Sequence, residues 1–148
     1  MNAVEIFSAD LTDSLSLLFA NDGVRAGFPS PAQDYMEETL DLNKELISNP
    51  EATFYGKVKG NSMVDAGVSD GDILVIDRSI EASDGNMIVG CLDGEFTLKF
   101  IDFSMRKSDI IWLVPANKDY DRIKVTPERD FCIWGVVVYT IKKRLDRI

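Results

Sequence analysis

The chain has 148 residues, a net charge of -9 and no histidine, and its length suits a single domain with a substantial core. The acidic balance argues against direct DNA binding, because proteins that track nucleic acid phosphates use surfaces rich in lysine and arginine. The absence of histidine excludes Ser-His-Asp and Cys-His nucleophile pairs, together with every zinc site that needs an imidazole ligand.

The apolar runs of the chain are as long as strands and too short to span a membrane. The first fourteen residues contain Glu5, Asp10 and Asp13 but no lysine or arginine, which fits neither a secretory signal nor a mitochondrial transit peptide. Cys91 and Cys132 lie in apolar runs, where buried thiols are expected and no CxxC metal pair is formed. We therefore expect a cytoplasmic protein without a disulfide, a metal or a cofactor.

Residues 1–26 show no clear period, because apolar residues are mixed with acids, glycine and asparagine. Leu11, Leu15 and Leu18 could form one short helical face, but no neighbouring helix is available to pack against it. We expect residues 1–26 to form an extended or weakly ordered acidic arm.

Helix signals begin at residues 30–33, where Ser-Pro-Ala-Gln combines an N-cap serine, a proline at the first helical position and a glutamine at the third. Met36 and Leu40 continue an apolar face four residues apart, so a short helix is predicted there. A second short helix is predicted over residues 41–47, before an Asn-Pro pair ends it.

Beyond Glu51 the chain is typical of strands separated by turns. The pair Asp93-Gly94 between two apolar runs is the strongest hairpin signal. Six strands at regular spacing, without intervening helices, predict a mostly β fold with a curled, largely antiparallel sheet. The six runs are residues 53–59, 72–78, 86–92, 95–103, 110–116 and 131–143.

In a chain without histidine, a serine hydroxyl can be activated by a neutral lysine amine. Free lysine has a pKa of about 10.4, so a lysine that acts as a base near pH 7 must be buried. Lys99 is the candidate, because it lies between Leu98 and Phe100 in a run that is apolar on both faces. Taken alone, Lys99 could equally be a strand lysine whose stem covers apolar surface.

Ser62 is the matching candidate nucleophile. It follows Gly60 at the junction between a predicted strand and a turn, where a backbone can approach closely. Taken alone, Ser62 would be read as an ordinary turn residue. The pair of Ser62 and Lys99 indicates chemistry that neither residue indicates alone.

The two motifs, in this order, resemble the LexA/UmuD family of Ser-Lys self-cleaving proteins. The first is Gly-Asn-Ser-Met at residues 60–63, followed by a Ser-Asp-Gly-Asp turn at 69–72, and the second is Asp-Gly-Glu-Phe-Thr-Leu-Lys at 93–99. Ala-Gly-Phe-Pro-Ser-Pro-Ala at 26–32 is similar to the segment that opens the UmuD core. The resemblance covers the chain from residue 26 to about residue 140 and is closest to the UmuD branch.

The resemblance implies a role for each site residue. Ser62 would be the nucleophile, Lys99 the general base, and the backbone N–H groups of Ser62 and Met63 an oxyanion site. The bond to be cut would join Ala26 to Gly27. Small residues at this bond suit a tight cleft.

The resemblance also implies the domain organisation and the fold. Residues 1–26 would be a cleavable arm, and residues 27–148 a peptidase-like β-domain of the kind shared by LexA and signal peptidases. It further implies an SOS-response function, in which a RecA–single-stranded DNA filament stimulates cleavage after DNA damage. The shortened chain would then act as a homodimer and as the accessory subunit of a Y-family, UmuC-like translesion DNA polymerase.

Three alternatives are weighed against this interpretation. A LexA-type repressor needs a DNA-binding helix-turn-helix ahead of the catalytic domain, and an acidic arm of this length is too short to form one. A signal peptidase would carry an N-terminal apolar span. A non-cleaving regulatory or polymerase-binding module of the same fold, with Ser62 and Lys99 idle, remains open.

Overall fold

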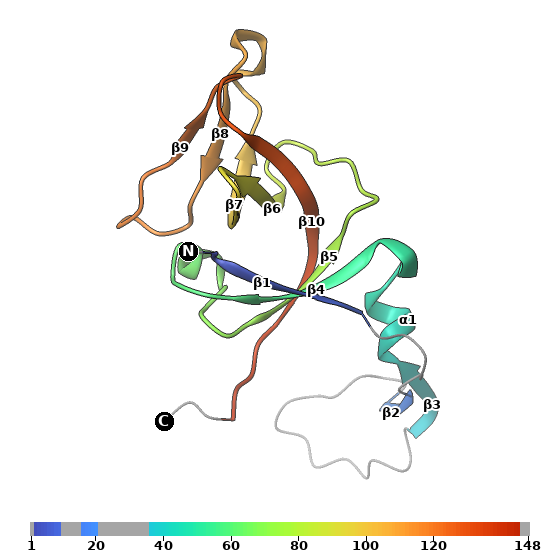
Figure 1. Ribbon diagram of the computed structural model, residues 1–148. Helices are drawn as coiled ribbons and strands as arrows, with labels where there is room; N and C mark the ends of the chain where they lie inside the picture. Colours follow the sequence, from blue (N-terminus) through green and yellow to red (C-terminus); the bar gives the residue numbers. More distant parts are fainter. Residues whose placement is uncertain (1, 10–15, 21–35, 146–148) are drawn as a thin grey trace. The chain divides into compact units, whose positions relative to one another are not determined.

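The computed structural model describes residues 2–9, 16–20 and 36–145 (Figure 1). They fall into two compact units, one made of the residues up to Ala9 and from Glu51 onward, and the other lying within Asp10–Pro50. Ala26 and Gly27, the capping box at 30–33, Leu11 and Leu15 lie outside the described residues. The predicted scissile bond therefore stays a prediction.

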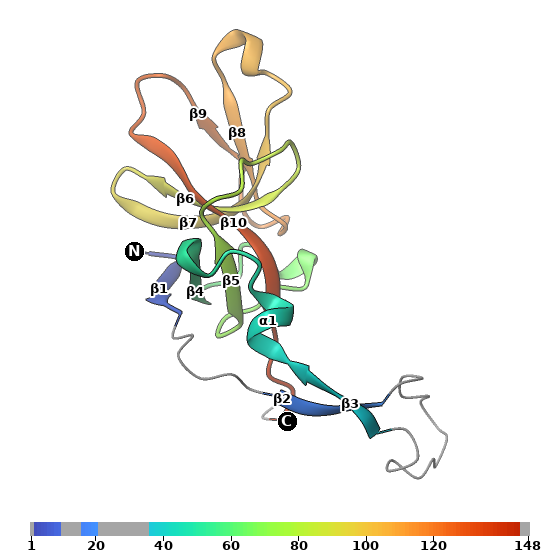
Figure 2. The same ribbon diagram turned by 90° about the vertical axis from the view of Figure 1, so that its right-hand side faces the viewer.

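The larger unit is built on one curled antiparallel sheet, so the prediction of a mostly β, antiparallel fold is confirmed (Figures 1 and 2). Its strand order is β1-β4-β5-β10-β6-β7-β8-β9. The strands are β1 Val4–Ser8, β4 Thr53–Val58, β5 Ile73–Asp77, β6 Met87–Leu92, β7 Glu95–Asp102, β8 Ile111–Val114, β9 Ile123–Val125 and β10 Phe131–Ile141, and the short 3-10 helices are η2 Pro50–Ala52, η3 Val64–Ala66 and η4 Arg106–Ser108.

All six predicted strands are present as β4, β5, β6, β7, β8 and β10. The hairpin predicted at Asp93-Gly94 connects β6 to β7, with Leu92 paired to Glu95. Asp93 has φ 51° and Gly94 has φ 85°, so both central residues of the turn have the positive φ that a type I′ hairpin requires. The three-residue strand β9 has no counterpart among the predicted strands, because it is too short to show alternation.

The curl of the sheet comes largely from β10, which pairs with β6 along its first half and with β5 along its second half. Its register shifts between Ile133 and Gly135 and again between Val137 and Tyr139. Such irregularities bend a strand and increase its twist. A Cβ on Gly135 would lie 2.6 Å from Ile76 Cγ2, so a glycine is needed where β10 crosses β5.

The N-terminal arm contains a regular strand, where an extended or weakly ordered segment was expected. β1 lies antiparallel to β4, with a continuous register from Val4 opposite Val58 to Ser8 opposite Phe54. The side chain of Val4 is 1% exposed and belongs to the hydrophobic core of the sheet. The alternation of Val4 and Ile6 with polar neighbours carries a strand signal that the surrounding acids had obscured.

The smaller unit contains β2 Ser16–Ala20 and β3 Met36–Asp41, which pair antiparallel, and the short helix α1 Leu42–Leu46. The helix predicted over residues 41–47 is confirmed, with the Asp41 side chain accepting the Asn43 N–H at 3.1 Å as an N-cap. The helix predicted through Met36 and Leu40 is wrong, since both lie in β3. Leu18 lies in β2, so it does not belong to a helical face either.

The strand pairing of β2 with β3 explains why the local signals failed in this unit. Leu17 pairs with Leu40, and Ala20 pairs with Met36, across segments that are far apart in sequence. Spacing of apolar residues within one segment cannot reveal a partner strand elsewhere in the chain, and such pairing overrides local helix propensity.

Cys91 and Cys132 are free, and they occupy opposite positions on β6 and β10. Cys91 is half-buried but Cys132 is exposed, so the expectation of a buried thiol is wrong for Cys132. Within the described residues, no helix is long and apolar enough to cross a membrane.

Candidate active site

Ser62 lies in a loop that leaves the end of β4, and backbone hydrogen bonds fix its position. Gly60 turns the chain with φ +91°, a conformation that side chains other than glycine rarely adopt. The Gly60 N–H donates to Asp70 Oδ1 at 2.8 Å, which closes the loop. On the other side, the Ala116 N–H donates to the Ser62 carbonyl at 2.8 Å, and the Asp65 N–H donates to the Ala116 carbonyl at 2.7 Å.

Lys99 lies in the middle of β7 and is held there by burial. Its neighbours Leu98 and Ile101 are each 1% exposed, and Lys99 itself is only 6% exposed. β7 is covered on both faces, because Leu98 and Ile101 belong to two different hydrophobic clusters. The strand therefore carries its amine into the protein interior.

The two predicted residues are brought together by the fold. Lys99 Nζ lies 3.2 Å from Ser62 Oγ, 3.0 Å from Thr97 Oγ1 and 3.1 Å from the Leu98 carbonyl oxygen. A neutral amine has two N–H donors and one lone pair. Thr97 Oγ1 and the Leu98 carbonyl can accept the two N–H groups, which leaves the lone pair for the Ser62 hydroxyl proton.

Burial lowers the pKa of Lys99, because the charged ammonium loses hydration in the protein interior. None of the ion pairs between described residues includes Lys99, so no carboxylate partner there compensates for the lost hydration. The neutral amine is the form that can take a proton from serine. The site thus favours the protonation state that a base requires.

The backbone around Ser62 offers hydrogen-bond donors for a developing oxyanion. Among the described residues, the N–H groups of Ser62 and Met63 donate to no backbone or side-chain acceptor. The Met63 side chain is 1% exposed, and its packing in the hydrophobic core anchors the loop. Asn117 Nδ2 donates to the Asn61 carbonyl at 2.8 Å and holds the preceding peptide in place.

A buried carboxylate fixes the turn that follows the Ser62 loop. Asp72 is 3% exposed and accepts the Ser69 N–H at 2.8 Å. It also forms an ion pair with Lys142 at 2.5 Å, and Lys142 Nζ donates to Ser69 Oγ at 3.1 Å. The chain just beyond β10 is thereby tied to the turn that follows the Ser62 loop.

Sequence reasoning had missed the residues that support the dyad. Thr97 could have been found, because alternation along a strand places it on the same face as Lys99. Ala116, Asn117 and Lys142 gave no signal, since their contacts with the loop depend on the fold.

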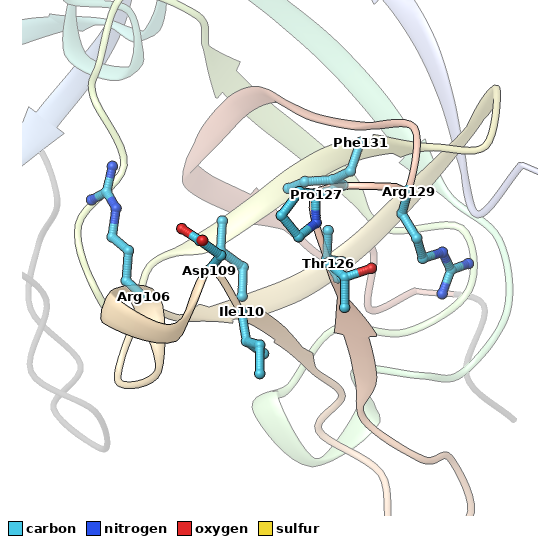
Figure 3. A pocket seen from close by; sticks show the side chains of 9 residues that line it. Arg106, Asp109, Ile110, Thr126, Pro127, Arg129 and Phe131 are labelled. Atoms are coloured by element: carbon cyan, nitrogen blue, oxygen red, sulfur yellow. The ribbon is translucent and has the colours of Figure 1, made fainter.

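Two surface hollows of the larger unit differ in their distance from the Ser62 loop. The pocket in Figure 3, of about 320 Å³, lies between η4 and the turn from β9 to β10 and is lined by neither Ser62 nor Lys99. Its arginines, Arg106 and Arg129, point away from each other and form no shared charged site (Figure 3). The second hollow, of about 410 Å³, is also lined by neither Ser62 nor Lys99, but its lining residues Ala116 and Asn117 donate hydrogen bonds to the carbonyls of Ser62 and Asn61.

Comparison with known proteins identifies the family of the chain. Residues 19–138 match the family described as Peptidase S24-like. The chain belongs to the peptidase S24-like family. It is 38% identical over 140 residues to Protein MucA of Salmonella typhimurium, which covers 93% of each chain.

Two further relatives of similar length match. Protein ImpA of Shigella flexneri is 43% identical over 126 residues, covering 85% of this chain and 83% of that one. Protein SamA of Salmonella typhimurium is 42% identical over 118 residues, covering 80% and 79%. This peptidase S24-like chain is a self-cleaving serine protease of the LexA/UmuD type and a UmuD-like protein of SOS mutagenesis.

Proposed function

We propose that Ser62 and Lys99 cut the Ala26–Gly27 bond of their own chain, releasing residues 1–26 from residues 27–148. The observation that carries this assignment is the 3.2 Å separation of Lys99 Nζ and Ser62 Oγ, with the lysine buried. This separation is within hydrogen-bonding range of the proton to be removed, the first requirement of a general base.

In the proposed reaction, neutral Lys99 takes the hydroxyl proton as Ser62 Oγ attacks the carbonyl carbon of Ala26. The N–H groups of Ser62 and Met63 stabilise the tetrahedral oxyanion. Lys99 then gives its proton to the amide nitrogen of Gly27, the C–N bond breaks, and an acyl ester forms on Ser62. Water, deprotonated by Lys99, hydrolyses the ester and leaves a carboxylate on Ala26 and a free amine on Gly27.

We propose that the hollow lined by Asp65 and Asn117 receives the chain next to the scissile bond. It adjoins the Ser62 loop through hydrogen bonds at both Asn61 and Ser62. Small residues such as Ala26 and Gly27 let a chain lie close to the Ser62 loop in such an open hollow.

A RecA–single-stranded DNA filament is the proposed activator. A base that is only partly neutral at pH 7 and an arm that is seldom docked would give slow cleavage by default. An activator that binds the docked conformation preferentially can then accelerate the reaction without supplying a catalytic group.

The shortened chain is proposed to be a cytoplasmic homodimer that serves as the accessory subunit of a Y-family, UmuC-like polymerase. The second half of β10 supports an interface, because Val138, Tyr139 and Ile141 are exposed to 37%, 44% and 40%. Apolar side chains gathered on one strand are typical of surfaces that bind another protein. No sequence-specific DNA binding is proposed, and tight retention on one DNA sequence would contradict the polymerase role.

The cleavage is tested by incubating the purified chain at about pH 9 to 10, where more of the lysine is neutral. Mass spectrometry should detect a fragment that begins at Gly27. Ser62→Ala and Lys99→Ala should abolish this fragment. Ser108→Ala and Lys107→Ala, which change an exposed serine and an exposed lysine of η4, serve as matched controls and should be cut normally. A Gly27 fragment that persists in both dyad variants would refute the assignment.

A further inference from the structure

The first residues of the chain connect the segment that leads from β4 to Ser62 with β7, the strand that carries Lys99. The Ala3 carbonyl accepts the Lys59 N–H at 2.7 Å, and the Ala3 N–H donates to the Phe96 carbonyl at 2.9 Å. The side chain of Asn2 adds a second bond, with Oδ1 accepting the Phe96 N–H at 2.7 Å. Ala3 therefore bridges the backbones at Lys59 and Phe96, and Asn2 adds a second hydrogen bond at Phe96.

These contacts lie close to the dyad along the chain. Lys59 is three residues before Ser62, and Phe96 is three residues before Lys99. In the sheet, three other strands separate β4 from β7, so the ladder itself links the two only indirectly. Ala3, just before β1, gives the segment after β4 a direct backbone connection to β7.

Burial strengthens the connection. Val4 is 1% exposed and shares a hydrophobic cluster with Met63 and Leu98, the residues next to Ser62 and Lys99 in sequence. β1 approaches β4 so closely that a Cβ on Gly56 would lie 2.7 Å from Val4 Cγ1. The start of β1 is therefore packed as core and has backbone partners on both sides.

We propose that Asn2, Ala3 and Val4 form a positioning strand that holds the Ser62 loop and the Lys99 strand at reacting distance. The catalytic part of this role rests on the proposed function. The 3.2 Å contact is at the long end of hydrogen-bond distances, so a small separation of β4 from β7 would break it. A displacement of about 1 Å in a catalytic group can cost on the order of a hundredfold in rate.

This role has a consequence for the reaction, because the positioning strand lies on the N-terminal side of the Ala26–Gly27 bond. Before cleavage, the strand is part of the same chain as the dyad. After cleavage, it is a separate peptide that is held by non-covalent contacts alone. Its dissociation would loosen the dyad, so the reaction limits its own catalyst after one turnover.

The test measures the dyad itself, independently of cleavage. In the full chain with Ser62→Ala, which stays uncut, lysine labelled with ¹³C at Cε reports the titration of Lys99 by NMR. Asn2→Ala removes the acceptor for the Phe96 N–H, and Ala3→Pro removes the donor to the Phe96 carbonyl. Each should move the titration of Lys99 upward toward the ordinary lysine value, because water reaches an amine that is no longer held in place.

Two comparison variants separate positioning from general stability. Asn2→Asp retains an oxygen acceptor and should restore the titration of the parent chain. Ser8→Ala changes the exposed far end of β1 and should leave the titration unmoved. An unchanged Lys99 titration in folded Asn2→Ala and Ala3→Pro chains would overturn the proposal, whatever happens to the cleavage rate. Absence of the Gly27 fragment from the unmodified chain would instead refute the proposed function. The titration of Lys99 would still decide whether residues 2–4 position the dyad.

Discussion

The Ser62 loop and the Lys99 strand are built on opposite principles. Ser62 lies in a turn whose position is set by polar contacts, among them Gly60 with Asp70 and Ser62 with Ala116. Lys99 lies in a regular strand whose surroundings are apolar on both faces. A nucleophile must be reachable by a substrate, whereas an amine that acts as a base must be shielded from water. The fold meets the two demands by joining a hydrogen-bonded loop to a buried strand.

Replacing the base tests the buried side of this comparison and should have the largest effect. In Lys99→Arg the positive charge is retained, but a guanidinium group does not lose its proton in proteins. We expect self-cleavage to fall by at least a hundredfold, the usual contribution of a general base. The loss of activity is measured as the rate at which the Gly27 fragment appears at alkaline pH. Cleavage of Lys99→Arg at the normal rate would mean that Lys99 supplies only charge.

The sequence identified the dyad because both residues are unusual in their local setting. Lys99 interrupts an apolar run, and Ser62 follows a strand in a chain that has no histidine. Apart from Thr97, the supporting contacts could not be predicted, because Ala116 and Asn117 reach the Ser62 loop from a segment distant in sequence. β1 was missed for another reason, because the acids around it obscured the alternation of Val4 and Ile6 with polar neighbours.

Removing a hydrogen-bond acceptor from the lysine should have an intermediate effect. Thr97 Oγ1 lies 3.0 Å from Lys99 Nζ and accepts one of its N–H groups. Thr97→Val keeps the shape but leaves that N–H unpaired in the interior, which costs about 1 to 3 kcal/mol. We expect cleavage to slow roughly tenfold. Thr97→Ser retains the hydroxyl and should cleave at close to the normal rate, and equal loss in both variants would indicate a packing defect.

The cost of burying the amine should also appear in the stability of the uncut fold. The pKa of Lys99 is lowered in the folded chain, so between that value and the ordinary value of about 10.4 the unfolded chain binds more protons. The free energy of unfolding therefore rises with pH through that window. Lys99→Met removes the penalty and should raise the free energy of unfolding at neutral pH. Urea unfolding at several pH values should show that the stability difference between Lys99→Met and the parent chain shrinks toward about pH 11. A difference that is constant with pH would mean that it does not come from the buried amine.

The smallest effect on cleavage is expected in the Ser62 loop, whose position is fixed by several hydrogen bonds. Asp70→Ala removes the acceptor of the Gly60 N–H. The contact of Ala116 with Ser62 remains, and so does the contact of Asn117 with Asn61. A single exposed hydrogen bond contributes about 1 kcal/mol, so we expect cleavage to slow roughly three- to tenfold. Asp70→Asn keeps an oxygen acceptor without the charge and should stay close to normal. If Asp70→Ala slowed cleavage as much as Lys99→Arg, the position of the loop would depend on one contact. The proposed difference between a loop held by several polar bonds and a base held by burial would then be wrong.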